Sequence, residues 1–293
     1  MAMERQTSWG GVVAFYMFLA GTGAGVYTAG FILGLISNLK WLALTGMMLG
    51  PILVMSGLVC LLLEAGAPLQ SYRLFKGLST SWMSRGGLIQ VLFIILGLGY
   101  VLPGFWISRW LGSGVGIALG SIALVVALAI ATYHGMVLTE YRAIPLWSSS
   151  VLPLLSFFTA LCTGLGLLLL ISPAYVGLYD STGIAKGIDI LIIAGIVFIV
   201  GELISLWSLM GIRSSTIYAE SIMRLKMPMI ASIICLFLAL LLLLGLVIGE
   251  VTYFTWVFPI SGVLLLASGF ITRYSILKGG YYIPLRIPVP SSF

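Results

Sequence analysis

Four acidic or basic side chains lie inside or at the ends of long apolar segments, where they could carry out acid–base chemistry. They are Glu64, His134, Glu140 and Glu202. A charge inside a membrane-spanning helix costs about 2.5–3.5 kcal/mol on insertion scales, so such groups usually mark a pathway or a site. Glu202 is the deepest, because fourteen mostly apolar residues precede it. A carboxyl group held away from water can carry a proton.

Each of these groups also has a structural interpretation. Glu202 and His134 can be satisfied by hydrogen bonds to neighbouring helices, and Glu64 by water at the end of its segment. Glu140 fits a loop position best. We predict that Glu64, His134 and Glu202 transfer protons.

Two tyrosines fall at the same depth as these groups. If the apolar segments are helices, Tyr16, Tyr133, His134 and the carboxyl groups Glu64 and Glu202 all lie in one leaflet of a membrane. A quinone has two oxygens that accept hydrogen bonds, exchanges protons during its redox reaction, and carries an apolar tail.

We therefore predict that Tyr16, Tyr133 and His134 bind the head group of a quinone of the menaquinone or ubiquinone type. Trp147 is a further candidate, which either packs against the quinone ring or marks the membrane interface.

The segments that must position these side chains are eight apolar blocks. Hydrophobic residues make up 61% of the chain and charged residues 8%, against roughly 25% charged residues in a soluble domain. A spanning helix needs roughly 20 apolar residues, and the blocks lack the alternation of barrel strands. We predict an all-α integral membrane protein whose first helix is retained. The predicted spans are 11–36, 42–63, 86–106, 112–138, 151–172, 188–211, 228–249 and 254–274.

A short internal repeat indicates how the spans are grouped. Residues 16–25 and 157–166 both carry an aromatic residue six positions before a Thr-Gly pair. We predict two four-helix bundles, residues 1–150 with the quinone site and residues 151–293 with a C-terminal tail. An even number of spans places both termini on the same side.

Basic residues divide unevenly between the two sides. The side opposite the termini holds Lys40, Arg109 and Lys186. The side of the termini holds Arg5, Arg73, Lys76, Arg85, Arg142, Arg213, Arg224, Lys226, Arg273, Lys278 and Arg286. The positive-inside rule places the second group in the cytoplasm. We therefore predict a multi-pass protein of the cytoplasmic (inner) membrane, although a basic face also suits an acidic partner or anionic lipid.

The remaining composition argues against other cofactors and ligands. Cys60, Cys162 and Cys235 are isolated, whereas an iron–sulfur cluster usually needs four thiolates. With one histidine, the chain cannot bind haem through two histidines. The segment Gly21–Gly25 lacks the strand and the lysine of a nucleotide loop, so we read it as a helix-packing motif. We expect no metal, no haem, no iron–sulfur cluster and no nucleic acid bound by this chain.

Several motifs, in this order, resemble those of the polysulfide reductase membrane subunit (NrfD/PsrC) family, including anchors similar to those of dimethyl sulfoxide reductase. They are Ser8-Trp9-Gly10 with Tyr16 and Gly21–Gly25, Glu64-Ala65-Gly66-Ala67-Pro68 with Arg73, Ser81-Trp82-Met83-Ser84-Arg85-Gly86, Tyr133-His134-Gly135, Ile144-Pro145-Leu146-Trp147, Leu152-Pro153 and Thr163-Gly164. The resemblance covers most of the first 170 residues.

The resemblance implies a membrane subunit that exchanges electrons between the quinone pool and a ferredoxin-like iron–sulfur subunit. That partner would serve a molybdenum or tungsten bis-pterin catalytic subunit. Tyr133 matches a tyrosine that contacts the quinone in this family. Tyr16 stands where polysulfide reductase has a histidine, and Val13 where it has an asparagine. Glu64 replaces an aspartate and keeps the acid.

Two other functions remain open from the residues alone. A secondary transporter or ion-conducting protein would also show repeats and a buried carboxylate, usually with broken helices at matching positions. Pro51 and Pro259 do not match in this way. An anchor without quinone chemistry is the second alternative. The final substrate of the complex and the direction of electron flow are left open.

Overall fold

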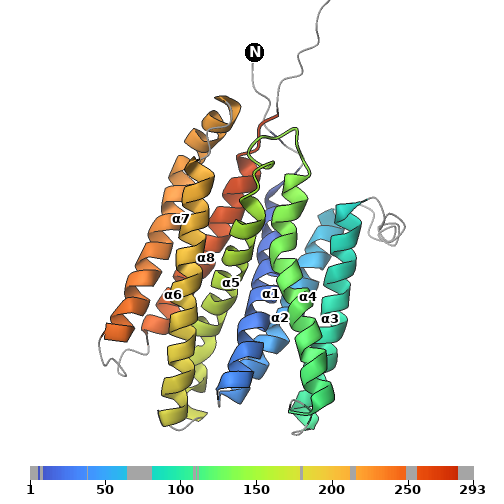
Figure 1. Ribbon diagram of the computed structural model, residues 1–293, viewed down its shortest axis with the longest axis vertical. Helices are drawn as coiled ribbons and strands as arrows, with labels where there is room; N and C mark the ends of the chain where they lie inside the picture. The colour runs from blue at the N-terminus through green and yellow to red at the C-terminus, as the bar shows by residue number, and fades with distance from the viewer. Residues whose placement is uncertain are drawn as a thin grey trace, which may run out of the picture.

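The computed structural model describes residues 6, 9–37, 39–64, 81–107, 110, 112–178, 181–211, 216–248 and 256–282. Eight helices within these residues are long and apolar enough to cross a membrane, which confirms the prediction of an all-helical fold with eight spans (Figure 1). They are α1 Gly11–Ile36, α2 Lys40–Glu64, α3 Trp82–Trp106, α4 Gly114–Thr139, α5 Leu152–Ile171, α6 Ser181–Gly211, α7 Thr216–Ile248 and α8 Val257–Lys278. A 3-10 helix, η2 Ser172–Leu178, continues α5.

Four helices extend beyond the predicted spans by four residues or more. α3 begins at Trp82 instead of 86, α6 at Ser181 instead of 188, α7 at Thr216 instead of 228, and α8 ends at Lys278 instead of 274. Apolar length marks only the part of a helix that lies in hydrocarbon. The backbone hydrogen bonds continue into the polar flanks, and hydropathy does not register those turns.

Local signals account for several helix ends. The Ser81 hydroxyl accepts a hydrogen bond from the Ser84 amide at the start of α3, and Ser113 accepts from Gly116 at the start of α4. α5 starts with Pro153 in its first turn, where a proline costs no helical hydrogen bond. Pro51 lies inside α2, which membrane helices tolerate when neighbouring helices satisfy the freed backbone groups.

Packing contacts run in two series. α1 to α4, here called the first half, pack in chain order, and α4 returns to α1. α5 to α8, the second half, pack in the same way, and α8 returns to α5. That each half is a separate unit stays a prediction.

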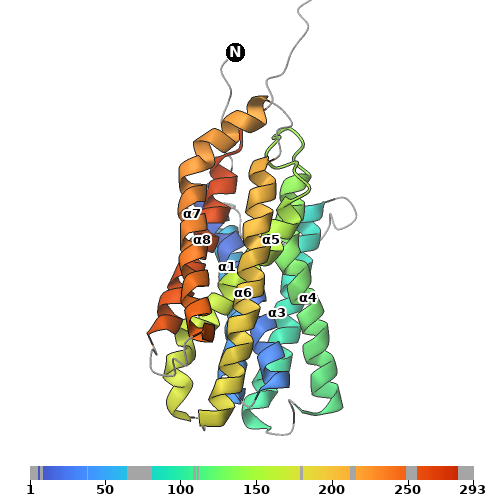
Figure 2. The same cartoon turned by 60° about the vertical axis from the view of Figure 1, so that its left-hand side comes forward.

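Helix α1 joins the two halves because it also packs against α5 and α8. A Cβ on Gly25 of α1 would overlap the backbone carbonyl of Ala160 in α5. Small residues of this kind let helix backbones approach closely in lipid. α1 is accordingly the most buried span and α7 the least, and α7 lies at the edge of the bundle (Figures 1 and 2).

The segments before α1 and after α8 are bonded to each other at one end of the bundle. The backbone N–H of Gln6 donates to the Gly280 carbonyl at 3.1 Å, and the side-chain amide of Gln6 donates to the Leu277 carbonyl at 2.8 Å. That this end faces the cytoplasm stays a prediction. Arg5, Arg73, Lys76, Arg109, Arg213, Arg286 and the tail 283–293 lie outside the described residues.

Candidate functional site

Four side chains from three helices of the first half form what we call the tyrosine cluster: Tyr16 of α1, Gln90 of α3, and Tyr133 and His134 of α4. All four are buried. The Gln90 amide nitrogen donates to the Tyr16 hydroxyl at 2.5 Å. The His134 ring lies 5.5 Å from the Tyr16 ring and 5.5 Å from the Tyr133 ring, edge to face in both cases. The structure thus brings together the three side chains predicted to bind a quinone head group.

The tyrosine cluster holds unused hydrogen-bonding capacity. Among the described residues, the Gln90 side-chain oxygen and the ring nitrogens of His134 make no hydrogen bond of good geometry, and His134 has only a weaker contact with the backbone of Ile130. The Tyr16 hydroxyl accepts from Gln90, so its own proton is free to be donated. Tyr133 donates to the Met83 carbonyl at 3.5 Å, which is long for such a bond. A buried group without a partner is costly, so this arrangement favours a polar ligand.

Tyr133 owes its position to a glycine on α3. A Cβ on Gly86 would overlap the Tyr133 ring. The Tyr133 hydroxyl therefore reaches the start of α3 only because that position has no side chain. Tyr16, Tyr133 and His134 lie within about 10 Å of the helix ends, by the rise of 1.5 Å per residue.

Glu202 lies in the second half, apart from the tyrosine cluster. It is on α6 and fully buried. Its Oε1 atom accepts a hydrogen bond from the Thr159 hydroxyl of α5 at 2.9 Å, and the Cys162 thiol of α5 also lies against the carboxyl group. The hydrogen bond between Thr159 and Glu202 thus connects α5 with α6.

Arg273 corrects one assignment made from the sequence. It was counted with the basic residues on the membrane surface, but it is 6% exposed. Its guanidinium donates to the backbone carbonyl of Met17 on α1, and it interacts electrostatically with Glu202. The predicted span ended at 274, whereas α8 continues to Lys278, which places Arg273 more than one turn inside the helix.

Helix α1 makes room for this guanidinium. A Cβ on Gly21 would overlap the guanidinium of Arg273. Nε and Nη2 of Arg273 have no hydrogen-bond partner among the described residues. One buried cation therefore links the halves and retains free donors.

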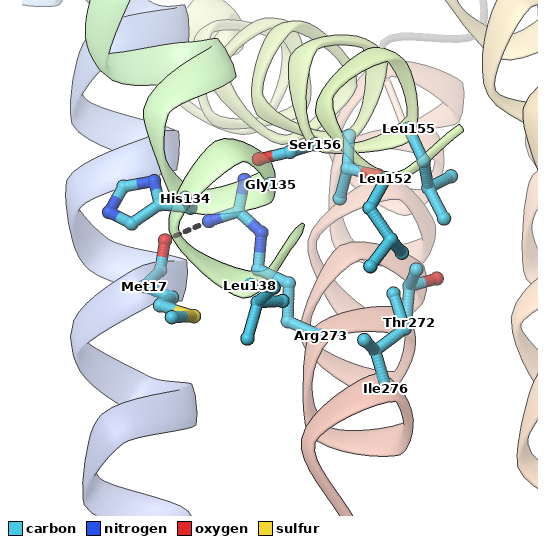
Figure 3. A pocket seen from close by; sticks show the side chains of 11 residues that line it. Met17, His134, Gly135, Leu138, Leu152, Leu155, Ser156, Thr272, Arg273 and Ile276 are labelled. Atoms are coloured by element: carbon cyan, nitrogen blue, oxygen red, sulfur yellow. Dashed lines mark hydrogen bonds between the residues drawn. The ribbon is translucent and has the colours of Figure 1, made fainter. Parts of the chain in front are cut away.

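A small cavity lies between the two halves beside these groups (Figure 3). Its volume is about 30 Å³. Figure 3 shows the Arg273 side chain reaching from α8 toward Met17, with the His134 ring beside it. The cavity is lined by Met17, His134, Gly135, Leu138, Leu152, Leu155, Ser156, Thr159, Thr272, Arg273 and Ile276.

The other predicted site residues lie elsewhere. Glu64 is the last residue of α2 and is exposed. Trp147 is buried between Trp9 and Tyr141, with ring centroids at 5.4 and 5.9 Å, and its indole donates to the Ile276 carbonyl at 2.9 Å. These contacts hold the loop after α4 against the end of α8. Glu140 directly follows α4 and is exposed.

Two residues of this region were not identified from the sequence. Gln90 follows Leu88 and Ile89 inside a predicted span. A single amide side chain inside an apolar span is the sequence feature that could have identified it as a site residue. For Arg273 the signal was the row of small residues in the last span, including Ser268 and Gly269. Within the described residues, no group of three or more His, Cys, Asp or Glu side chains is placed to hold a metal ion.

Comparison with protein families gives one match. The family model described as polysulphide reductase, NrfD, matches residues 1–284. A search of curated proteins finds no match. Members of this family are quinone-interacting membrane subunits that normally associate with an iron–sulfur subunit and a molybdoenzyme catalytic subunit. The chain therefore belongs to the NrfD family and is a membrane subunit of a polysulphide reductase type of complex.

Proposed function

We propose that this chain is the quinone-reactive membrane subunit of a molybdenum or tungsten oxidoreductase complex, and that the quinone head group binds at the tyrosine cluster. The observation that carries the proposal is the set of buried polar atoms on His134 and Gln90 that make no hydrogen bond of good geometry, beside two tyrosine hydroxyls. A quinone of the menaquinone or ubiquinone type presents oxygens to such donors and keeps its tail in lipid.

The donors and acceptors of each side chain in the tyrosine cluster determine its role in the proposal. Tyr16 donates its hydroxyl proton to one ligand oxygen, because Gln90 already occupies its acceptor side. Tyr133 turns from the long bond with Met83 toward the ligand. The neutral imidazole of His134 has one donor and one acceptor nitrogen, so it can accept a proton from the ligand. A bound quinol supplies two electrons and two protons.

The protons leave the tyrosine cluster by two carboxyl groups in this proposal. Glu202 is buried in the second half, and Glu64 is exposed at the end of α2. Glu202 serves as a proton store within the protein, and Glu64 exchanges protons with water. Trp147 has a packing role, because its indole N–H is used by the end of α8.

Electrons pass between the quinone and a ferredoxin-like iron–sulfur subunit, which serves the bis-pterin catalytic subunit. The end of the bundle near the tyrosine cluster is the docking side, since electron transfer favours a short path. Lys278 and Arg142 contribute to the basic charge of that end. We also propose that this end faces the cytoplasm, on the distribution of basic residues.

The test compares Tyr133→Phe with Tyr27→Phe in the purified complex. Tyr27 is a matched control because it is also buried in the first half, donates to the Gly120 carbonyl, and lies about 17 Å further along α1 than Tyr16. Oxidation of a short-chain menaquinol analogue is measured, and direct reduction of the catalytic subunit by a viologen dye reports an intact complex.

Tyr133→Phe is expected to raise KM for the quinol analogue roughly three- to tenfold, the effect of one hydrogen bond of about 0.5–1.5 kcal/mol. Tyr27→Phe is expected to leave KM unchanged. Equal kinetics in wild type and Tyr133→Phe, with viologen activity retained in both, would argue for an anchor without quinone chemistry at this site. Purification of the chain without any iron–sulfur partner would favour the transporter alternative.

A further inference from the structure

Arg273 belongs to the second half, but its side chain is directed at the helix that carries Tyr16. The guanidinium donates to the backbone carbonyl of Met17, the residue that follows Tyr16 on α1. Figure 3 shows the side chain reaching from α8 to α1, with the His134 ring beside it. A Cβ on Gly21, one turn further along α1, would overlap the same guanidinium. The charged end of Arg273 therefore lies next to the tyrosine cluster of the first half.

The charge of Arg273 is shielded from water. Among the residues whose burial the structure describes, Arg273 is the only buried arginine or lysine. It interacts electrostatically with His134 as well as with Glu202. A buried charge is screened much less by water and salt than an exposed one, so its effect extends over a longer distance. A ligand at the tyrosine cluster is within that distance.

Glu202 offsets this charge mainly on the side of the second half. Its carboxyl group accepts a hydrogen bond from Thr159 and lies against the Cys162 thiol, and both of these residues are on α5. The guanidinium of Arg273 contacts α1 instead. The two groups together present their positive end to the tyrosine cluster, and a cation favours the negative form of a neighbouring oxygen atom.

We propose that Arg273 makes the tyrosine cluster accept ligands with a negatively charged ring oxygen, so that an ionised hydroxyquinone binds at least as tightly as a neutral quinone of the same size. Arg273 acts through its charge, while Tyr16, Tyr133 and His134 supply the hydrogen bonds. The inference rests on the function proposed above and adds the class of ligand that the site selects. In that function, the same charge favours the loss of a proton from a ligand hydroxyl to His134.

The test compares two naphthoquinones that carry the same short alkyl chain at position 3. A 2-hydroxy-1,4-naphthoquinone is ionised at neutral pH, and the matched 2-methyl-1,4-naphthoquinone is neutral. The Kd of each is measured by titration of the purified complex at neutral pH. The ratio of the two Kd values reports the selectivity for charge, because a change that affects both ligands equally cancels in the ratio.

Three variants separate the charge of Arg273 from its packing. Arg273→Met/Glu202→Gln removes both buried charges, and Arg273→Lys keeps the cation. Lys278→Met is the control, because Lys278 is a partly exposed cation at the end of the same helix, with its amine 5.8 Å from the Tyr274 ring centre.

The double variant is expected to shift the ratio roughly three- to tenfold against the ionised ligand. At an effective dielectric constant of about 20, a unit charge on the order of 10 Å away changes the binding of an anion roughly tenfold, and the loss of Glu202 offsets part of this change. Arg273→Lys and Lys278→Met should leave the ratio close to that of the wild type. A purely structural role of Arg273 would weaken both ligands equally and leave the ratio unchanged in the double variant, which would overturn the proposal.

The wild type alone also decides the question if the double variant does not assemble. An apolar site without a nearby cation would reject the ionised ligand by roughly tenfold or more, and that result in the wild type would contradict the proposal. Tyr133→Phe on the same ligands separates the two proposals. If it weakens neither ligand, the proposed function fails and this inference fails with it. If it weakens both while the ratio does not depend on Arg273, only this inference fails.

Discussion

Gln90 fixes the orientation of the Tyr16 hydroxyl, and it is the member of the tyrosine cluster that the sequence motifs did not include. The Gln90 side chain is fully buried on α3, and its oxygen has no partner among the described residues. Since Tyr16 accepts from Gln90, its own proton is available to a ligand oxygen in the proposed site. Gln90 is therefore a positioning residue in the proposed site.

Replacing Gln90 by leucine is expected to weaken binding of a quinol-site inhibitor of the hydroxyquinoline N-oxide type roughly three- to tenfold, because the Tyr16 proton is no longer directed. Fluorescence quenching of the inhibitor measures its Kd. Thr28→Val is the control, because the Thr28 hydroxyl is buried on α1 and bonds only to the Ala24 carbonyl of the same helix. An unchanged Kd in Gln90→Leu would exclude a positioning role.

Arg273 and Glu202 are expected to behave as a coupled pair. Removing one of two buried groups of opposite charge is destabilising, because the other charge is left uncompensated. Arg273→Met should therefore lower the unfolding temperature in detergent strongly, and Arg273→Lys, which keeps the charge, should lower it less. The double variant Arg273→Met/Glu202→Gln should recover part of the loss. Losses that simply add in the double variant would show that the two charges do not interact.

At the scale of the helices, the contact between α1 and α5 depends on two glycines. Gly25 faces the Ala160 carbonyl, and Gly164 faces the backbone of Gly25. A methyl group at Gly25 meets backbone, which cannot rotate away, so the helices would have to separate. Overpacking of this kind typically costs about 1–3 kcal/mol.

Gly25→Ala should therefore destabilise the protein, and Gly87→Ala should not. Gly87 lies on α3 with nothing within 4 Å of an added Cβ, and alanine there improves helix propensity by up to about 1 kcal/mol. Thermal unfolding of both variants in the same detergent makes the comparison. A Gly25→Ala protein as stable as Gly87→Ala would mean that the close helix contact is not what holds the halves together.

The helices could be predicted from the sequence because apolar length sets a span directly. α1 was predicted to its last residue, and the longer α6 and α7 differ only in their polar flanks. The sequence did not predict how each helix is rotated about its own axis, because nearly all faces of these helices are apolar. That is why Arg273 was assigned to the surface, and why Gln90 was not recognised as the partner of Tyr16 until the packing of α1 against its neighbours was known.

At the scale of the whole molecule, the polar groups form two regions on either side of the contact between the halves. The tyrosine cluster belongs to the first half, and Glu202 with Thr159 to the second. His134 and Arg273 line the cavity between them. In the proposed mechanism, ligand binding and proton storage are therefore separate tasks of the two halves.

This separation predicts that Glu202→Gln leaves binding of the hydroxyquinoline inhibitor unchanged and slows quinol oxidation by about tenfold or more, since acid–base groups contribute on that scale or above. Inhibitor titration and steady-state oxidation of the same preparation provide both numbers. Ser205→Ala on the same helix, whose hydroxyl bonds only to the Gly201 carbonyl, is the control. Weaker inhibitor binding in Glu202→Gln would place the carboxyl at the ligand instead.

The most direct measurement is a structure of the complex with a menaquinone analogue bound. The proposal predicts that the head group lies at the tyrosine cluster, with its oxygens within hydrogen-bond distance of Tyr16, Tyr133 or His134. A head group bound elsewhere, with these three side chains keeping the contacts described above, would contradict it.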